Sequence, residues 1–255
     1  MSDPSSYRLG ELRQALPGTT IHWFPRLGST NTRGAEMARN GTLRPPAILL
    51  TGWQVAGRGR GTNTWWSTAG SLTVTFAYSA TPRLLQELPL VAGVCVRRVL
   101  AAASGLEQLK LKWPNDLLYD GRKIGGLLCE RVHEIDLIGV GLNVNFEIAA
   151  APPLLRNRIT SVQALTGRTL EHTSLLIALA RELAEEIAAA RPLEQIIAEY
   201  ARHDALAGQP VHVVEPDGTS RSGIAVGLDD TGRLIIRSGR LAHHIIAGHV
   251  EAAVR

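Results

Sequence analysis

Residues 109–132, LKLKWPNDLLYDGRKIGGLLCERV, decide the fold class of this chain. Asp120-Gly121 is a dipeptide typical of a two-residue β-turn, because both positions tolerate a positive φ. The flanking runs, 117–119 and 123–131, are therefore expected to pair as a hairpin. A further short strand is expected at 109–113, where the apolar run stops at a proline. This segment predicts a sheet whose strands are joined in hairpins.

Outward from this segment, hydrophobic patterns predict more strands and several helices. Buried or β-branched runs predict strands, and apolar residues at helical spacing predict helices. The expected strands are 20–25, 47–53, 71–78 and 134–144, and the expected helices are 6–16, 29–41, 176–187, 193–200 and one that follows Pro89. We therefore expect an α+β domain over residues 1–207, with a mixed sheet and flanking helices.

The pattern of apolar and turn-forming residues changes after Gly208. Short β-branched runs alternate with the turn dipeptides Asp217-Gly218 and Thr231-Gly232. Such spacing is typical of small all-β modules. Residues 208–255 are therefore expected to form a separate small β-barrel domain.

Composition excludes several classes of protein. Hydrophobic residues make up 45% of the 255 residues and charged residues 20%, which is globular rather than disordered, collagenous or coiled-coil composition. A membrane span and a secretory signal are not expected, because no apolar run is long enough and the N-terminus lacks a basic, then apolar, pattern. Cys95 and Cys129 are not spaced as a redox or disulfide motif, so a cytoplasmic location is expected. A net charge of +4 is too small for a DNA-binding stripe.

All three lysines of the chain lie close together in sequence. They are Lys110, Lys112 and Lys123, among 24 arginines. The cluster is either a chance feature of an arginine-rich chain or a place that needs a compact ammonium group. Lys112 and Lys123 fall on strands expected to be buried on one face, where a lysine needs a negative partner. That partner is either an anionic ligand or Asp116 in a structural ion pair.

A long polar loop is expected between residues 54 and 70. It contains Gly57-Arg58-Gly59-Arg60-Gly61, followed by Trp65 and Trp66. Alternating glycines let a backbone approach a ligand closely. A guanidinium group can bind two oxygens of a phosphate or carboxylate at once. The alternative is a solvated basic loop or an RNA-binding arginine–glycine tract, although such tracts repeat and this one does not.

Two further segments carry polar groups that fit either a ligand or a structural role. Ser29-Thr30-Asn31 precedes an expected helix, so it either caps that helix or binds a neutral polar ligand. Gly139 and Gly141 alternate along an expected strand, leaving room for a ligand or another backbone. Asn143, at the end of that strand, either binds a ligand or caps a turn.

Taken together, the motifs around residues 29–31, 54–67, 112–116, 123–130 and 138–145 resemble the biotin protein ligase family in order and spacing. The resemblance runs from about residue 21 to the C-terminus. It implies the class II synthetase-like catalytic domain of biotin and lipoate ligases, and a C-terminal SH3-like barrel. Bifunctional members also carry an N-terminal DNA-binding module; too few residues precede the first strand here, so the ligase-only form is expected.

The resemblance also implies a reaction. Family members use ATP and Mg²⁺ to activate biotin as biotinyl-5′-AMP. They then transfer biotin to a lysine of a biotin carboxyl carrier protein domain in acetyl-CoA carboxylase or a related carboxylase. We expect the same here, with no DNA or membrane partner, and either a monomer or a homodimer. The alternatives are a lipoate– or octanoate–protein ligase, or a non-enzymatic biotin-sensing regulator.

The resemblance assigns roles to individual residues. Lys123 would contact the biotin carboxylate and the charge that develops on it, and Asp116 would orient the carrier lysine. The loop arginines would close over the carboxylate–phosphate junction and shield the adenylate from water. The assigned catalytic residues are Lys123, Arg58, Arg60 and Asp116; the biotin-binding residues are Ser29, Thr30, Asn31, Gln54, Gly57, Arg58, Gly59, Arg60, Lys123, Gly126, Gly139 and Gly141; the nucleotide-binding residues are Arg58, Arg60, Trp65, Lys112, Asn115 and Asn143. No metal-ligand set is assigned.

Overall fold

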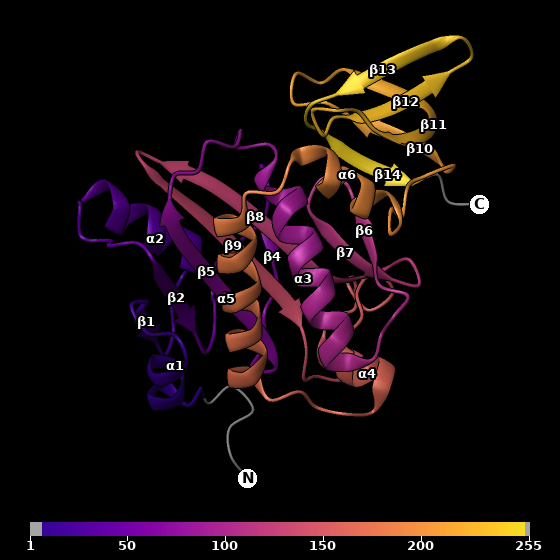
Figure 1. The fold of residues 1–255 in the computed structure, drawn as a ribbon. Helices are drawn as coiled ribbons and strands as arrows, with labels where there is room; N and C mark the ends of the chain where they lie inside the picture. The colour runs from indigo at the N-terminus through magenta and orange to yellow at the C-terminus, as the bar shows by residue number, and fades with distance from the viewer. Residues whose placement is uncertain (1–6, 253–255) are drawn as a thin grey trace.

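The computed structural model describes residues 7–252 and contains a large mixed sheet, a smaller antiparallel sheet and a two-stranded ribbon (Figure 1). The large sheet has seven strands in the order β1-β2-β5-β9-β8-β7-β6, of which only β1 and β2 are parallel neighbours. The strands are β1 Thr20–Phe24, β2 Ala47–Thr51, β5 Ser71–Ser79, β6 Lys110–Lys112, β7 Asp116–Tyr119, β8 Arg122–Val132 and β9 Ile135–Asn143. The expected mixed sheet is therefore confirmed.

The hairpin around Asp120-Gly121 has the expected geometry. The two turn residues have φ values of 48° and 70°, as a two-residue hairpin turn requires. The register of β7 on β8 shifts between Leu117 and Leu118, which is a bulge in the ladder. Local turn chemistry thus determines this part of the sheet.

Helices cover both faces of the large sheet. They are α1 Leu9–Ala15, α2 Thr30–Arg39, α3 Leu88–Ser104, α4 Val162–Thr166, α5 His172–Ala189 and α6 Leu193–Ala201, with a single 3-10 turn at Ile148–Ala150. Figure 1 shows α3 and α5 side by side over one face, and α2 packs on β5 and β9 from the other. The sequence patterns missed α4, because five residues are too few to show helical periodicity.

The two faces of the sheet differ in character because side chains alternate along a strand. In β5, Leu72, Val74 and Phe76 belong to the large apolar core beneath α3 and α5. The intervening residues, Thr73 and Thr75, are buried on the opposite face. β9 alternates in the same way, with Ile138, Val140 and Leu142 in the core and Gly139 and Gly141 between them. One face is therefore apolar core, and the other is a floor of threonines and glycines.

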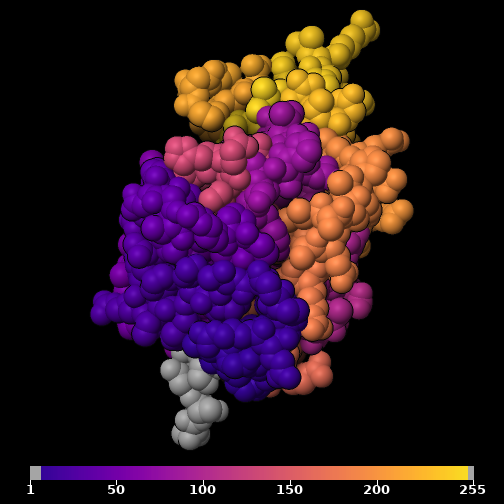
Figure 2. Space-filling view, turned by 60° about the vertical axis from the view of Figure 1, so that its left-hand side comes forward, coloured from indigo at the N-terminus to yellow at the C-terminus, as the bar shows by residue number. Residues whose placement is uncertain are grey.

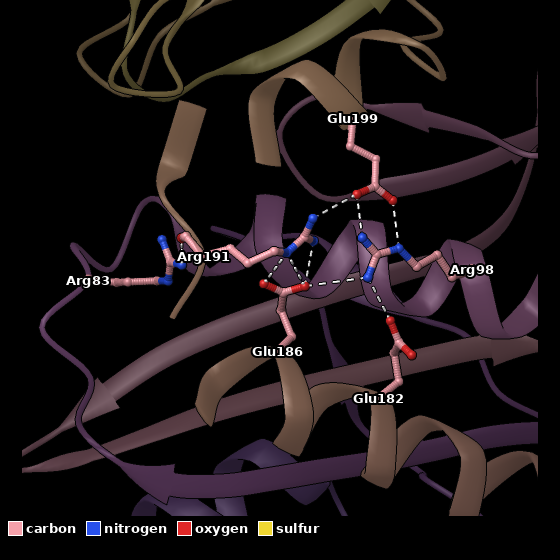
Figure 3. Close-up of polar contacts among 6 residues, drawn as sticks. All are labelled: Arg83, Arg98, Glu182, Glu186, Arg191 and Glu199. Carbon is pink, nitrogen blue, oxygen red and sulfur yellow. Dashed lines mark hydrogen bonds and ion pairs between the residues drawn. The ribbon is translucent and has the colours of Figure 1, made fainter. Parts of the chain in front are cut away.

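An ion-pair cluster joins three helices (Figure 3). Arg98 of α3 bonds to Glu182 and Glu186 of α5 and to Glu199 of α6. Arg191, between α5 and α6, also binds Glu186 and Glu199. Burial on its own would raise the pKa of Glu199, but its hydrogen bonds with the two arginines lower it. The arginines thus keep the Glu199 carboxylate ionised although it is partly buried.

We expect Arg98→Ala to destabilise the chain. The substitution removes the cation that pairs with Glu182. It also leaves Glu186, which is only 5% exposed, paired with Arg191 alone. Breaking a buried pair from one side is costly, and with Arg98 one-third exposed we expect about 2 kcal/mol. The measurement is thermal unfolding, with a Tm lower by roughly 5 °C. Arg181→Ala, which removes one exposed bond to the Ala15 carbonyl, is the control; equal Tm values for both variants would contradict the prediction.

The smaller sheet has five antiparallel strands in the order β13-β12-β11-β10-β14. They are β10 Pro210–Val214, β11 Ser220–Leu228, β12 Leu234–Ser238, β13 Leu241–Ile245 and β14 His249–Ala252. Figure 2 shows this segment, in yellow, as a lobe that caps one end of the molecule. The buried indole of Trp113 donates to the Gly232 carbonyl at 3.1 Å and thereby ties the lobe to the large sheet. No helix within residues 7–252 has the length and apolar character that crossing a membrane requires.

Candidate functional site

A cavity of about 970 Å³ lies on the threonine–glycine face of the large sheet. β5, β8 and β9 form its floor, and the glycine–arginine loop, residues 57–65, forms one wall. The small sheet closes another side with Val214, Gly248 and Val250. The site is therefore built between the two parts of the molecule.

Most of the residues selected from the sequence line this cavity. They are Ser29, Thr30, Asn31, Gln54, Arg58, Gly59, Arg60, Trp65, Lys112, Asn115, Asp116, Lys123, Gly126, Gly139 and Gly141. Two others lie behind the lining. Gly57 faces β4, where a Cβ would meet the Trp65 carbonyl oxygen at 2.4 Å. Asn143 is buried and donates from Nδ2 to the Lys123 carbonyl at 3.3 Å, while its Oδ1 has no partner among the described residues.

One end of the cavity, which we call the amide end, is built from Thr30, Asn31, Gln54 and Thr75. Ser29 caps α2, so the helix begins here and its first residues face the sheet. Thr30 donates to Gln54 Oε1 from its backbone N–H at 2.7 Å and from its hydroxyl at 3.1 Å. The Thr75 hydroxyl lies 2.8 Å from Thr30 Oγ1 and 2.6 Å from Asn31 Oδ1. The amide end therefore carries neutral donors and acceptors in a fixed network.

The space above the two floor glycines is occupied by side chains of this chain. A Cβ on Gly139 would lie 2.2 Å from Asn31 Oδ1. A Cβ on Gly141 would lie 2.6 Å from the indole ring of Trp65. The Trp65 Nε1 is buried and has no acceptor among residues 7–252. The two glycines thus leave room for Asn31 and Trp65, and the indole N–H of Trp65 is a buried donor that has no acceptor among the described residues.

The opposite end, which we call the lysine end, contains Lys112, Lys123 and Asp116. Lys123 Nζ lies 2.5 Å from Asp116 Oδ1 and 5.7 Å from the centre of the Trp65 ring. Burial lowers the pKa of Lys112, partly offset by Asp116 and reinforced by the nearby Lys123. The ion pair that the sequence left as an alternative is present, and it lies inside the cavity. Two ammonium groups share one carboxylate, so the lysine end favours an added anion.

The glycine–arginine loop is a short hairpin of β3 Gly57–Arg58 and β4 Thr64–Trp65. Arg58 reaches toward the amide end, where its guanidinium pairs with Glu130 at 2.9 Å. Arg60 reaches the other way and donates to the Gly248 carbonyl at 3.1 Å. Burial lowers the pKa of Arg60, and nearby Asp116 opposes that effect. The sequence placed both arginines at one junction; in this structure they lie at different ends.

Sequence reasoning missed two parts of the cavity wall. The first is the segment around Leu155, Asn157 and Arg158, which is held to β8 because Lys123 N donates to the Arg158 carbonyl at 2.9 Å. The second is the contribution of the small sheet, including His249. Neither segment carries a recognisable ligand-binding motif, so nothing in the sequence indicated that either would line the cavity.

Comparisons with known proteins agree with this architecture. The profile of the Biotin/lipoate A/B protein ligase family matches residues 23–147, and that of the biotin protein ligase C-terminal domain matches residues 207–251. The solved biotin protein ligase of Aquifex aeolicus, in complex with biotin and ATP, superposes with a TM-score of 0.81 over 91% of this chain and 97% of that one, at 24% identity. That likeness shows the fold.

Sequence relatives extend the match to nearly the whole chain. The biotin–[acetyl-CoA-carboxylase] ligase of Mycobacterium tuberculosis is 32% identical over 94% of this chain and 93% of its own length. That of Paracoccus denitrificans is 31% identical over 83% of this chain and 92% of its own. The bifunctional ligase/repressor BirA of Escherichia coli is 27% identical over 92% and 75%. This chain belongs to the biotin protein ligase family.

Proposed function

We propose that this chain is an ATP-dependent biotin protein ligase, which activates biotin as biotinyl-5′-AMP and transfers it to a lysine of a carrier protein. The observation that carries the proposal is the polarity of the cavity. Its amide end suits a neutral ureido ring, and its lysine end suits a carboxylate and phosphates. Biotin has these two groups at its opposite ends.

At the amide end, the proposed ligand contacts come from Thr30, Asn31 and Gln54. A ureido ring needs both donors and acceptors, and these side chains supply both in a preorganised network. The Ser29 side chain caps α2, and Ser29 also lines the cavity. Trp65, over Gly141, would contact the ring or chain of the ligand.

At the lysine end, Lys123 would hold the biotin carboxylate while a carboxylate oxygen attacks the α-phosphate of ATP, which breaks the bond to the β-phosphate and releases pyrophosphate. The ammonium group is fixed where negative charge grows, which stabilises the transition state. Asp116 pairs with Lys123 at 2.5 Å, and we assign it to orienting the incoming carrier lysine or accepting its proton. Arg60, Lys112 and Asn115 would contact the phosphates.

The lysine end also fits the magnesium ion that accompanies ATP. Mg²⁺ is commonly held by substrate phosphates, waters and one or two carboxylates. Among residues 7–252, Asp116 is the carboxylate that lines the cavity, and these residues contain no cluster of three acidic, histidine or cysteine side chains able to hold a metal unaided. We infer that the ion would arrive with ATP, with Asp116 as its protein contact, and would neutralise phosphate charge.

We propose a biotin carboxyl carrier domain of a carboxylase as the acceptor, and the cytoplasm as the location. The relatives at 31–32% identity are biotin–[acetyl-CoA-carboxylase] ligases, which supports the acceptor class. Cys95 and Cys129 are free, and burial raises the pKa of both thiols. Unreactive free thiols suit a reducing compartment. The division into a catalytic domain at 1–207 and a β domain at 208–255 also remains our proposal.

The test is mass spectrometry of an apo biotin carrier domain incubated with this chain, biotin and MgATP. We expect the carrier to gain one biotinyl group only when biotin and ATP are both present. Transfer of lipoate or octanoate instead would keep the fold and overturn the substrate. No acyl transfer at all would overturn the ligase and leave the biotin-sensing regulator.

A further inference from the structure

We propose that Glu130 is a positioning residue that fastens the glycine–arginine loop over the amide end of the cavity by holding Arg58. This inference rests on the proposed function, because the loop it fastens covers the proposed biotin site. Glu130 does not itself line the cavity.

Glu130 links the glycine–arginine loop to Asn31, which lines the amide end of the cavity. Its Oε1 accepts from Arg58 Nη2 at 2.9 Å, and its Oε2 accepts from Arg58 Nη1 at 3.4 Å. The same Oε2 accepts from Asn31 Nδ2 at 2.9 Å. The paired geometry of a guanidinium and a carboxylate restricts the loop in orientation as well as in distance.

Asn31, to which Glu130 is bonded, is itself held by several contacts. Asn31 is 3% exposed, and its Nδ2 also donates to the Leu128 carbonyl at 2.9 Å. Its Oδ1 accepts from the Thr75 hydroxyl and lies against Gly139. Glu130 is therefore attached to a side chain that is fixed on three sides. A partner held this firmly lets Glu130 bind Arg58 at little further cost in entropy.

The position of Glu130 along β8 separates this anchor from the reacting groups. Gly126 borders the ammonium of Lys123, with a Cβ there lying 3.0 Å from Nζ. Glu130 is four residues further along the strand, which is about 13 Å at the usual rise. Arg58 is thus held far from the carboxylate–phosphate junction. Its anchor should affect how long ligand stays bound rather than the chemical step.

The loop has a second attachment at its other arm, where Arg60 donates to the Gly248 carbonyl. The two arginines are separated by a single residue in sequence, and they attach the loop to two different sheets. Of the two anchors, Arg58–Glu130 is the charged one. It should therefore dominate the closing of the amide end, and a neutral residue at position 130 should weaken it.

The experiment measures how fast preformed biotinyl-5′-AMP leaves the enzyme. The full chain is loaded with biotin and MgATP, desalted, and followed over time without carrier. For Glu130→Gln, whose amide oxygen still accepts from Asn31, we expect release about two- to fivefold faster than for the wild type, the size of one partly exposed charge pair. The rate of adenylate formation at saturating substrate should stay within about twofold of the wild-type rate. The KM for biotin should therefore rise while kcat is unchanged.

Two further variants test whether Glu130 acts through Arg58. In an Arg58→Ala background, E130Q should add no further increase in release, whereas a general structural defect would add to it. Glu36→Gln is the matched control, because Glu36 pairs with Arg33 at 3.3 Å on α2 and touches no loop residue; it should release adenylate at the wild-type rate. If E130Q does not fold, Arg58→Gln replaces it, because it removes the other charge of the same pair and leaves Asn31 bound to Glu130; it should release adenylate about two- to fivefold faster than the wild type.

The outcomes distinguish this inference from the proposed function. A wild-type chain that forms no adenylate would overturn the proposed function. A wild type that forms and retains adenylate, beside an E130Q variant that retains it equally well, would overturn the anchor alone. An additive effect of E130Q on R58A would also overturn it, since Glu130 would then act by another route.

Discussion

Lys123→Arg should lower the rate of biotinyl-adenylate formation by about a hundredfold, the size typical of losing one preorganised charge contact. The substitution keeps the positive charge but changes the shape of the group that carries it. Lys123 Nζ lies 2.5 Å from Asp116 Oδ1 and close against the backbone of Gly126, under the ring of Trp65. A planar guanidinium on a longer side chain presents its nitrogens at other positions, so they would be displaced from the attacking oxygen.

The measurement is biotin-dependent exchange of pyrophosphate into ATP, which reports adenylate formation without carrier. Lys110→Arg is the matched control, because Lys110 is an exposed lysine on β6 that does not line the cavity. We expect the control to keep wild-type exchange. Near-normal exchange by Lys123→Arg would show that charge alone matters there, and would overturn the requirement for a compact ammonium group.

Gly139→Ala should weaken biotin binding and destabilise the fold. The new Cβ would lie 2.2 Å from Asn31 Oδ1 and 3.1 Å from the Leu128 carbonyl oxygen. Asn31 cannot rotate away without losing its bonds to Leu128, Thr75 and Glu130. Overpacking a well-fitted site typically costs 1–3 kcal/mol, and we expect a loss of about 2 kcal/mol in unfolding free energy.

Biotin affinity should fall by at least about tenfold in the same variant, because the displaced amide is part of the proposed ureido site. Isothermal titration with biotin and thermal unfolding check the two effects separately. Gly10→Ala is the control; it lies in α1 with no atom within 4 Å of its Cβ position, so it should bind biotin normally and be slightly more stable. Unchanged affinity and Tm in Gly139→Ala would contradict the arrangement of Asn31 against the floor.

Much of the fold was predictable because it depends on neighbours in sequence. The turn at Asp120-Gly121 follows from the φ preferences of two residues, and Ser29 caps the expected helix. Strand alternation placed Gly139 and Gly141 on one face, and the structure confirms that they share the cavity floor. The segment at 162–166 escaped prediction because a helix this short depends on its cap and its surroundings.

The site was only partly predictable for a different reason. Its polar residues could be selected by type and spacing, but their partners are far away in sequence. Nothing local indicates that Glu130 receives Arg58, or that Arg60 meets Gly248. Such contacts depend on how β8, the loop and the small sheet dock together.

By itself, the sequence determined the hairpins, the faces of the strands, the helix that begins at residue 30 and the set of polar groups available for chemistry. Turn preferences and hydrophobic periodicity act over a few residues, so they can be read from the chain directly. The tertiary structure decided the rest: it filled the floor with Asn31 and Trp65, sent Arg58 and Arg60 to opposite ends, and closed the cavity with the small sheet. Those choices follow from packing and charge pairing between distant segments, which local patterns do not encode.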